Sequence, residues 1–122
     1  MKILIIEDSV RLADTIAEAL QNENYVVDTA NDGQLGYEHA STGIYDMVIL
    51  DLMLPKMNGY EVLSALRRDG QNVPVLILSA KTEIDDKIQG FTTGADDYMT
   101  KPFSLSVLLL KIEAHFRRRQ EK

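Results

Sequence analysis

Four apolar runs in this chain each end in a reactive polar side chain, and this feature constrains the fold more than any other. The runs are Ile3 to Ile6, Met47 to Leu50, Val75 to Leu78 and the short Tyr98 to Thr100, and they lead into Glu7 with Asp8, Asp51, Ser79 and Lys101. The carboxyl ends of parallel strands open onto one crevice, where such sheets bind ligands. If the runs are strands of one parallel sheet, three carboxylates, a hydroxyl and an ammonium group meet there.

The segments between these runs have the periodicity of helices, as in Val10, Ala13, Ile16, Ala17 and Leu20. Alternating strands and helices favour βαβ units and a parallel sheet. We therefore expect an α/β fold, with the first, third and fourth strands covered on both faces. The expected strands are Lys2 to Ile6, Tyr25 to Ala30, Asp46 to Leu50, Val73 to Leu78 and Asp97 to Thr100. Helices are expected from Val10, over Gly33 to Ser41, Asn58 to Asp69, Glu83 to Thr93 (with a capping box at Thr82 and Asp85) and Leu105 to Arg119.

Composition excludes several classes of protein. The 122 residues, 45% of them hydrophobic, suffice for one domain with a real core. A net charge of −6 argues against non-specific nucleic-acid binding by this domain alone, and the lack of cysteine excludes disulfides and thiolate chemistry. No apolar run approaches the roughly 20 residues of a membrane helix, so no membrane association is expected. Glu7 and Asp8 interrupt the first apolar run too early for a signal peptide, and we expect a cytoplasmic protein.

The carboxylates at the strand ends predict a bound cation. Two carboxylates about 4 Å apart repel by roughly 4 kcal/mol at an effective dielectric constant near 20, so three in one crevice need positive charge nearby. Lys101 supplies one charge, and a cation that prefers oxygen ligands, Mg²⁺ or Mn²⁺, is the natural second. Zinc is not favoured, because His39 and His115 both fall in helical stretches.

The same residues suit phosphoryl chemistry. A magnesium ion with few protein ligands typically completes its shell with phosphate oxygens. Asp51 is then the candidate nucleophile, since an aspartate can form an acyl phosphate while the metal and Lys101 stabilise charge on the transferred group. Ser79 is placed to hydrogen-bond the phosphoryl oxygens.

Each of these residues, taken alone, has a simpler structural explanation. Asp8 or Ser9 can cap the following helix, and Asp51 and Ser79 can be turn or capping residues. A lysine such as Lys101 is most often solvated. Independent structural roles would not place all of these residues at successive strand ends, so their combination favours a functional site.

The motifs around these residues resemble the receiver domain of two-component response regulators. The matching stretches are Ile5 to Asp8, Asp51 to Pro55 followed by Asn58 and Gly59, Leu78 to Ala80, and Gly94 to Phe103. The resemblance implies a single receiver domain over residues 1–122. It also implies the flavodoxin-like fold, a doubly wound five-stranded parallel sheet in the order 2-1-3-4-5 with five helices in three αβα layers.

The resemblance also assigns roles to the site residues. Asp51 would accept a phosphoryl group from the phosphohistidine of a sensor histidine kinase. Asp8, Asp51 and the backbone carbonyl of Met53 would bind the metal directly, and Glu7 would bind it through a water. Lys101, followed by a cis peptide to Pro102, would pair with Asp51 and then with the phosphoryl group.

By the same resemblance, phosphorylation would drive a two-state switch. The Ser79 hydroxyl would move toward the phosphoryl group while the Tyr98 ring turns inward. The surface near Ile88 and Phe91 would then rearrange. The protein would catalyse its own phosphotransfer without being a turnover enzyme.

The Gly94 to Phe103 stretch is most similar to the OmpR/PhoB subfamily, whose receivers precede a winged-helix DNA-binding domain. We therefore expect such a domain beyond Lys122, with DNA contacted only through it. Arg117, Arg118 and Arg119 have an equally good explanation as cations near a helix C-terminus.

That subfamily dimerises through the fourth helix, the fifth strand and the fifth helix. The positions of its three intersubunit ion pairs are Asp97 with Lys111, Asp96 with Arg118, and Lys87 with Val107. Val107 stands where a glutamate is expected, and Lys111, in place of arginine, cannot form a bidentate pair. The core needs only Leu105, Leu108, Leu109, Ile112 and Phe116 from the last helix, which leaves Val107 and Leu110 as an exposed apolar patch. We expect a dimer face that relies more on apolar contact and less on charge.

Two other classes of protein share part of this pattern. An enzyme with an aspartyl-phosphate intermediate, similar to the haloacid dehalogenase superfamily, would have a second aspartate two residues after the nucleophile, where this chain has Met53. A flavin-binding module would need a phosphate loop after the first strand, where Glu7 and Asp8 would repel an anion. A stand-alone receiver acting directly on a protein target remains an alternative within the same class.

Overall fold

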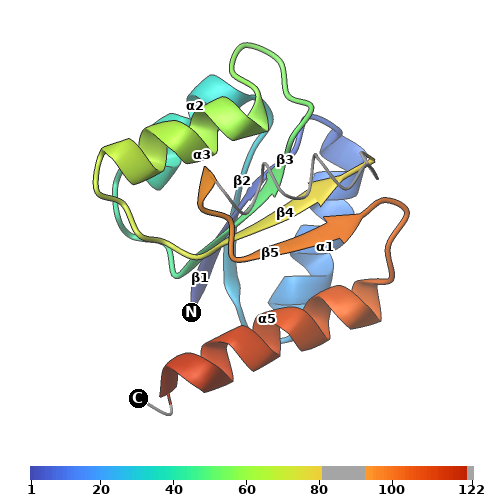
Figure 1. The fold of residues 1–122 in the computed structure, drawn as a ribbon. Coiled ribbons are helices and arrows are strands. Elements are labelled where there is room, and N and C mark those ends of the chain that lie inside the picture. The colour runs from blue at the N-terminus through green and yellow to red at the C-terminus, as the bar shows by residue number, and fades with distance from the viewer. Residues whose placement is uncertain (81–92, 121–122) are drawn as a thin grey trace.

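The computed structural model describes residues 1–80 and 93–120, with side chains described as far as residue 118. Its centre is a five-stranded parallel sheet in the order β2-β1-β3-β4-β5 (Figure 1). The strands are β1 (Lys2–Ile6), β2 (Val26–Ala30), β3 (Met47–Asp51), β4 (Val75–Ser79) and β5 (Asp97–Thr100). The predicted sheet and its strand order are confirmed.

Helices cover both faces of the sheet. They are α1 (Val10–Asn22), α2 (Gly33–Ala40), α3 (Gly59–Arg68) and α5 (Leu105–Gln120). Figure 1 shows α2 and α3 on one face and α1 and α5 on the other, which gives the three predicted layers. The helix predicted over Glu83 to Thr93 lies outside the described residues apart from its end, and so does the capping box predicted at Thr82 and Asp85.

The core lies on the two faces of the sheet. Every residue of β3 and β4 is buried, as are Ile3 to Ile6 of β1, which confirms that these three strands are covered on both sides. Ile3 and Ile5 pack toward α1 and α5, whereas Leu4 and Ile6 pack toward α2 and α3, as the alternation of side chains along a strand requires. Each such aliphatic side chain stabilises the fold by about 1.5–3 kcal/mol through burial.

Side chains cap the first turns of the helices that follow β1 and β3. Ser9 accepts a hydrogen bond from Leu12 N at 3.3 Å and caps α1. Asn58 and Glu61 form a capping box at α3, each side chain accepting from the other's backbone N–H. The loops that carry the polar side chains, residues 7–9 and 52–58, each run from a strand to a capped helix start and are therefore fixed at both ends.

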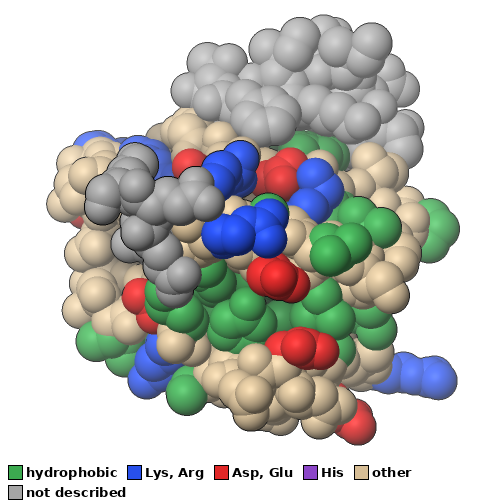
Figure 2. Space-filling view, turned by 90° about the horizontal axis from the view of Figure 1, so that it is seen from below, with side chains coloured by type: hydrophobic (Ala, Val, Ile, Leu, Met, Phe, Trp, Pro, Cys, Tyr) green, Lys and Arg blue, Asp and Glu red, His purple; other side chains and the backbone are tan. Residues whose placement is uncertain are grey.

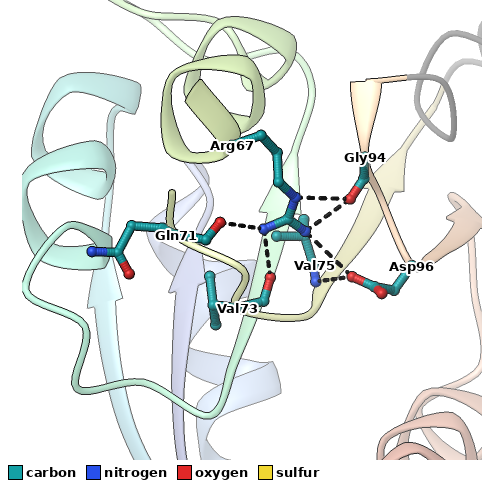
Figure 3. A network of polar contacts seen from close by, with 6 residues as sticks. All are labelled: Arg67, Gln71, Val73, Val75, Gly94 and Asp96. Atoms are coloured by element: carbon teal, nitrogen blue, oxygen red, sulfur yellow. Dashed lines mark hydrogen bonds and ion pairs between the residues drawn. The ribbon is translucent and has the colours of Figure 1, made fainter. Parts of the chain in front are cut away.

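A half-buried arginine joins α3 to the segment that precedes β5 (Figure 3). The Arg67 guanidinium donates to Gly94 O at 2.8 and 3.1 Å, to Gln71 O at 2.9 Å and to Val73 O at 2.8 Å. It also lies 3.4 Å from Asp96, which accepts a hydrogen bond from the N–H at the start of β4. Burial of the guanidinium lowers the Arg67 pKa, although the charge of Asp96 opposes this change. The Arg67 guanidinium is thus a shared donor to three backbone carbonyls from two separate loops.

The last helix divides into a core side and an exposed side, as its sequence predicts. Leu108, Ile112 and Phe116 are buried, and Leu105 and Leu109 pack against the same cluster. Val107 and Leu110 are 43% and 64% exposed. The predicted apolar patch on α5 is therefore present at the surface.

Candidate functional site

The predicted site residues meet at the carboxyl edge of the sheet. Asp51 is the last residue of β3 and lies beside Leu78, the residue before Ser79 at the end of β4. Glu7 follows β1, and its N–H continues the ladder by donating to Ala30 O at 3.0 Å. Lys101 follows β5 and donates its N–H to Ser79 O at 2.8 Å. Parallel pairing therefore brings residues from four separate stretches of the sequence to one place.

Three carboxylates form a cluster there. One oxygen each of Glu7, Asp8 and Asp51 lies within 4.8 Å of the other two. Glu7 and Asp51 are buried, at 2% and 5% exposure, whereas Asp8 lies at the surface. The site is thus a pair of buried acids with one solvent-facing acid at its mouth.

Lys101 supplies the positive charge, but its closest partner differs from the expected one. Its Nζ lies 2.6 Å from Glu7 Oε1 and 3.5 Å from Asp51 Oδ2. The expected pair with Asp51 is present, and the shorter pair with Glu7 was not anticipated. Burial alone would lower the pKa of Lys101, but the hydrogen bond that it donates to Glu7 and the charges of Asp51 and Glu7 outweigh burial and raise that pKa.

The same cluster raises the pKa of Asp8, which here means that its charged form is disfavoured. Its pKa is raised, first by partial burial and then by the hydrogen bond and the negative charge of Glu7, and Lys101 offsets only part of this. A carboxylate whose charged form is disfavoured by its neighbours gains most when a cation arrives.

Backbone groups fix the orientation of the two buried carboxylates. Ser9 N donates to Glu7 Oε2 at 3.2 Å, and Met53 N donates to Asp51 Oδ1 at 3.3 Å. Asn31 Nδ2 donates to Glu7 O at 3.1 Å, which ties the end of β2 to the site. Asn31 was not among the predicted site residues, although its position directly after β2 places it at the same edge of the sheet.

The remaining predicted site residues lie around this cluster. Ser79 is fully buried. Tyr98 is half-buried and packs against the core cluster on the α2 and α3 side of the sheet. Met53 has a largely exposed side chain, at 61%, and the Lys101–Pro102 peptide is cis, as expected. Ile88, Phe91 and Lys87 lie outside the described residues.

The donor set fits a hard divalent cation. Carboxylate oxygens suit Mg²⁺ and Mn²⁺, and the three acids bring more negative charge than Lys101 alone balances. Neither histidine belongs to this cluster. Glu7, Asp8 and Asp51 could therefore hold Mg²⁺ or Mn²⁺ here, as the sequence predicted.

Three charged residues of the predicted dimer face, Asp96, Asp97 and Lys111, have partners within the chain. Lys111 Nζ lies 3.0 and 3.2 Å from the two Asp97 oxygens, and Asp96 pairs with Arg67 of α3. Arg118 is exposed. Seen from the side of α5 (Figure 2), hydrophobic side chains are exposed among acidic and basic ones. The face thus combines an apolar patch with charged groups that intrachain contacts have partly neutralised.

Comparison with known proteins assigns the family. The chain matches the family model described as "Response regulator receiver domain" over residues 3–113. It is 42% identical over 118 residues to "Probable transcriptional regulatory protein SilR" of Salmonella typhimurium, covering 97% of this chain and 52% of that protein. It is 46% identical over 121 residues to "Response regulator ArlR" of Staphylococcus saprophyticus, covering 99% of this chain and 54% of that protein. The chain belongs to the response regulator receiver domain family, and it spans about half the length of these curated relatives.

Solved structures agree with this assignment. The receiver domain of the Francisella response regulator 1452 superposes with a TM-score of 0.92 at 33% identity, covering 97% of this chain and 98% of that one. The beryllofluoride-activated DrrB receiver domain superposes with a TM-score of 0.85 at 28% identity, covering 95% and 97%. Within the described parts of the chain, none of the helices has the length and apolarity needed to cross a bilayer.

Proposed function

We propose that Asp51 is the phosphoacceptor of this receiver domain and that a sensor histidine kinase supplies the phosphoryl group. One Asp51 oxygen forms the new bond to phosphorus as the bond from phosphorus to the donor's imidazole nitrogen breaks. The observation that carries the proposal is the position of Asp51, which is buried at the end of β3 with an ammonium group 3.5 Å away and two other carboxylates beside it. Burying a carboxylate beside other carboxylates lowers the stability of the fold. Such groups are found mainly at functional sites.

The metal proposed for this site is Mg²⁺ or Mn²⁺. Asp8, Asp51 and the Met53 carbonyl would hold it directly, and Glu7 would act through a water. When bound, it would neutralise charge on the transferring phosphoryl oxygens. Lys101 would orient Asp51 before the transfer and bind a phosphoryl oxygen afterwards, and its present contact with Glu7 keeps its Nζ at the site.

The proposed output is a change in the surface formed by β5, α5 and the segment between β4 and β5. The Ser79 hydroxyl would bind the phosphoryl group, and Tyr98 would turn toward the site. A ligand shifts such an equilibrium only by its different affinity for the two states. Ile88 and Phe91 would belong to the surface that changes. We propose a switch rather than a turnover enzyme, since Met53 stands where an aspartyl-phosphate hydrolase would need an acid.

In the whole protein, we propose that this switch controls dimerisation and transcription. SilR, of whose length the chain spans about half, is named as a probable transcriptional regulatory protein, which supports a DNA-binding domain after this one. The proposed dimer face comprises Lys87, Ile88, Phe91, Asp96, Asp97, Val107, Leu110, Lys111 and Arg118.

The phosphoacceptor is tested by intact-protein mass spectrometry after incubation with acetyl phosphate and Mg²⁺. The wild type is expected to gain the mass of one phosphoryl group, and Asp51→Asn is expected to gain none, because an amide is not a nucleophile at neutral pH. Asp14→Asn removes an exposed carboxylate on α1 and should be phosphorylated like the wild type. An adduct of equal yield on Asp51→Asn would disprove the assignment.

The dimer face is tested by sedimentation with a phosphate mimic. Val107→Lys should weaken the dimer about tenfold, or about 1.4 kcal/mol, because it replaces an apolar contact with a charge. Glu38→Gln, on the exposed side of α2, raises the net charge by the same one unit away from this face and should leave the dimer intact. If the wild type stays monomeric with the mimic, or if Val107→Lys has no effect, this face is not the interface.

A further inference from the structure

The loop between β3 and α3 contains a turn with a strained backbone. Met57 N donates to Pro55 O at 2.8 Å, and Lys56 between them has φ 69°. A hydrogen bond between residues two apart, around a residue of positive φ, defines the rarer and strained form of the γ-turn. A lysine in this region of backbone space is also uncommon. Some contact outside the turn must hold it in this conformation.

The start of α2 makes that contact. Gly33 N donates to Pro55 O at 3.2 Å, so the carbonyl of the turn satisfies an N–H that the helix leaves without a partner. Lys56 Nζ lies 3.5 Å from Asp32 Oδ2, and Asp32 also caps α2 through Leu35 N at 2.8 Å. We call Asp32, Gly33, Pro55, Lys56 and Met57 the loop brace.

Gly33 lies where no side chain fits. A Cβ at this position would lie 1.6 Å from Met57 O and 2.6 Å from Met57 C, and these are backbone atoms of the turn itself. Glycine lowers helix stability relative to alanine, so helix formation does not explain its presence at the first position of α2. The close approach of the turn does explain it.

The loop brace acts on the part of the loop that carries Met53. Next to β3, the loop is fixed by Gly59 N, which donates to Leu52 O at 2.9 Å. Farther along the loop, around Pro55 to Met57, it is fixed by the loop brace. Met53 lies between these two points, and its N–H donates to Asp51 Oδ1 at 3.3 Å. Strained backbone held in place by its surroundings is typical of functional sites. The position of the turn therefore sets where the Met53 backbone lies relative to Asp51.

We propose that Gly33 is a positioning residue for the metal site. Through its contact with Met57, the first residue of α2 holds the loop in the conformation in which the Met53 carbonyl can join Asp8 and Asp51 around a divalent cation. This inference rests on the proposed function, because it needs the metal site described above.

Gly33→Ala tests the contact directly. The new methyl group must push the turn away from α2, so the affinity for Mn²⁺, measured by the electron paramagnetic resonance of the free ion, is expected to fall at least tenfold. Gly70→Ala is the matched control. Gly70 has φ 80° and nothing within 4 Å of its Cβ position, so alanine there strains the backbone without meeting the loop. This control should keep the wild-type affinity for Mn²⁺.

Lys56→Gly provides a second variant should Gly33→Ala fail to fold. Glycine adopts φ 69° without strain, so the protein is expected to unfold at the same or a higher urea concentration. The loosened turn should nevertheless weaken Mn²⁺ binding about threefold. Removing a positive charge from the protein would by itself favour cation binding, so a weaker affinity can be attributed to the loop.

The outcomes separate this inference from the function on which it rests. If the wild type itself binds no Mn²⁺, the proposed metal site fails. If the wild type binds but both brace variants keep its affinity within twofold, or if Gly70→Ala loses as much affinity as Gly33→Ala, the positioning role of Gly33 is disproved. Weaker binding in the brace variants alone supports it.

Discussion

Lys101→Met is expected to lower the free energy of unfolding by about 3 kcal/mol at neutral pH in the absence of divalent cations. Removing one member of a buried ion pair leaves the other uncompensated, which costs about 3–5 kcal/mol, and the side chain of Lys101 is partly solvated at 23% exposure. Glu7 and Asp51, at 3% and 6% side-chain exposure, would be left facing one another. Urea unfolding followed by circular dichroism measures the loss.

Lys2→Met is the matched control for this prediction. Lys2 also pairs with an aspartate, Asp28, at 3.5 Å, but the two side chains are 34% and 42% exposed. Exposed pairs contribute about 0–1 kcal/mol, so this variant should lose little. Mg²⁺ should restore part of the stability of Lys101→Met, because the cation replaces the missing charge. Equal losses in the two variants would mean that Lys101 has no special role in neutralising the site.

The pH dependence gives a second measurement on the same pair of proteins. The folded-state pKa of Lys101 is raised above the ordinary lysine value of about 10.4. Its stabilising contribution is therefore fully present below that value and is lost as the pH rises through the folded-state pKa. The difference in stability between wild type and Lys101→Met should stay constant from neutral pH to about pH 9 and shrink above about pH 10.4.

Periodicity predicted the elements of this fold because hydrophobic spacing is a local property. The bounds of β1 and β5 are as predicted, and those of the other strands differ by one or two residues. The site followed from topology, since any polar residue that ends a strand of a parallel sheet must lie at one edge. Glu7, Asp51, Ser79 and Lys101 were found in this way, before any distance was known.

Contacts between loops could not be predicted in the same way. Nothing in the local sequence indicates that Arg67 donates to Gly94 O, or that Asp96 pairs with Arg67 instead of remaining free for Arg118. The local sequence also does not indicate that Lys101 Nζ lies closer to Glu7, at 2.6 Å, than to Asp51, at 3.5 Å. The sequence indicated Gly33 only as the first residue of a predicted helix, because the backbone atoms that exclude a side chain there come from Met57. Such contacts depend on how elements distant in the chain pack together.

Asp8→Asn is expected to change stability and metal affinity in opposite directions. The folded-state pKa of Asp8 is raised, first by partial burial and then by Glu7. For a group with a raised pKa, the stabilising contribution is present below its unfolded-state pKa and is lost as the pH rises through the folded-state value. At neutral pH the Asp8 charge therefore opposes folding in the metal-free protein, and the amide, which carries no charge, should raise the midpoint of urea unfolding.

The same substitution removes a third of the negative charge that attracts the cation. Affinity for Mg²⁺, measured by titration calorimetry, is expected to fall at least tenfold, or about 1.4 kcal/mol. Mg²⁺ at 100 times its dissociation constant stabilises the wild type by about 2.7 kcal/mol, and a tenfold weaker variant gains only about 1.4 kcal/mol at the same concentration. The variant is thus expected to be the more stable protein without Mg²⁺ and to lose that advantage as Mg²⁺ is added.

Asp14→Asn is the control that distinguishes this Mg²⁺-dependent reversal of relative stability from a general effect of net charge. It changes the net charge of −6 by the same amount but lies on the exposed side of α1, away from the carboxylate cluster. Its response to Mg²⁺ should match that of the wild type. Two results would contradict the prediction: the same reversal of relative stability in Asp14→Asn, or a lower stability of Asp8→Asn both with and without Mg²⁺. Either result would mean that bringing the three carboxylates together does not destabilise the metal-free fold in a way that the cation reverses. The cluster would then have to be explained by the folding of the domain alone.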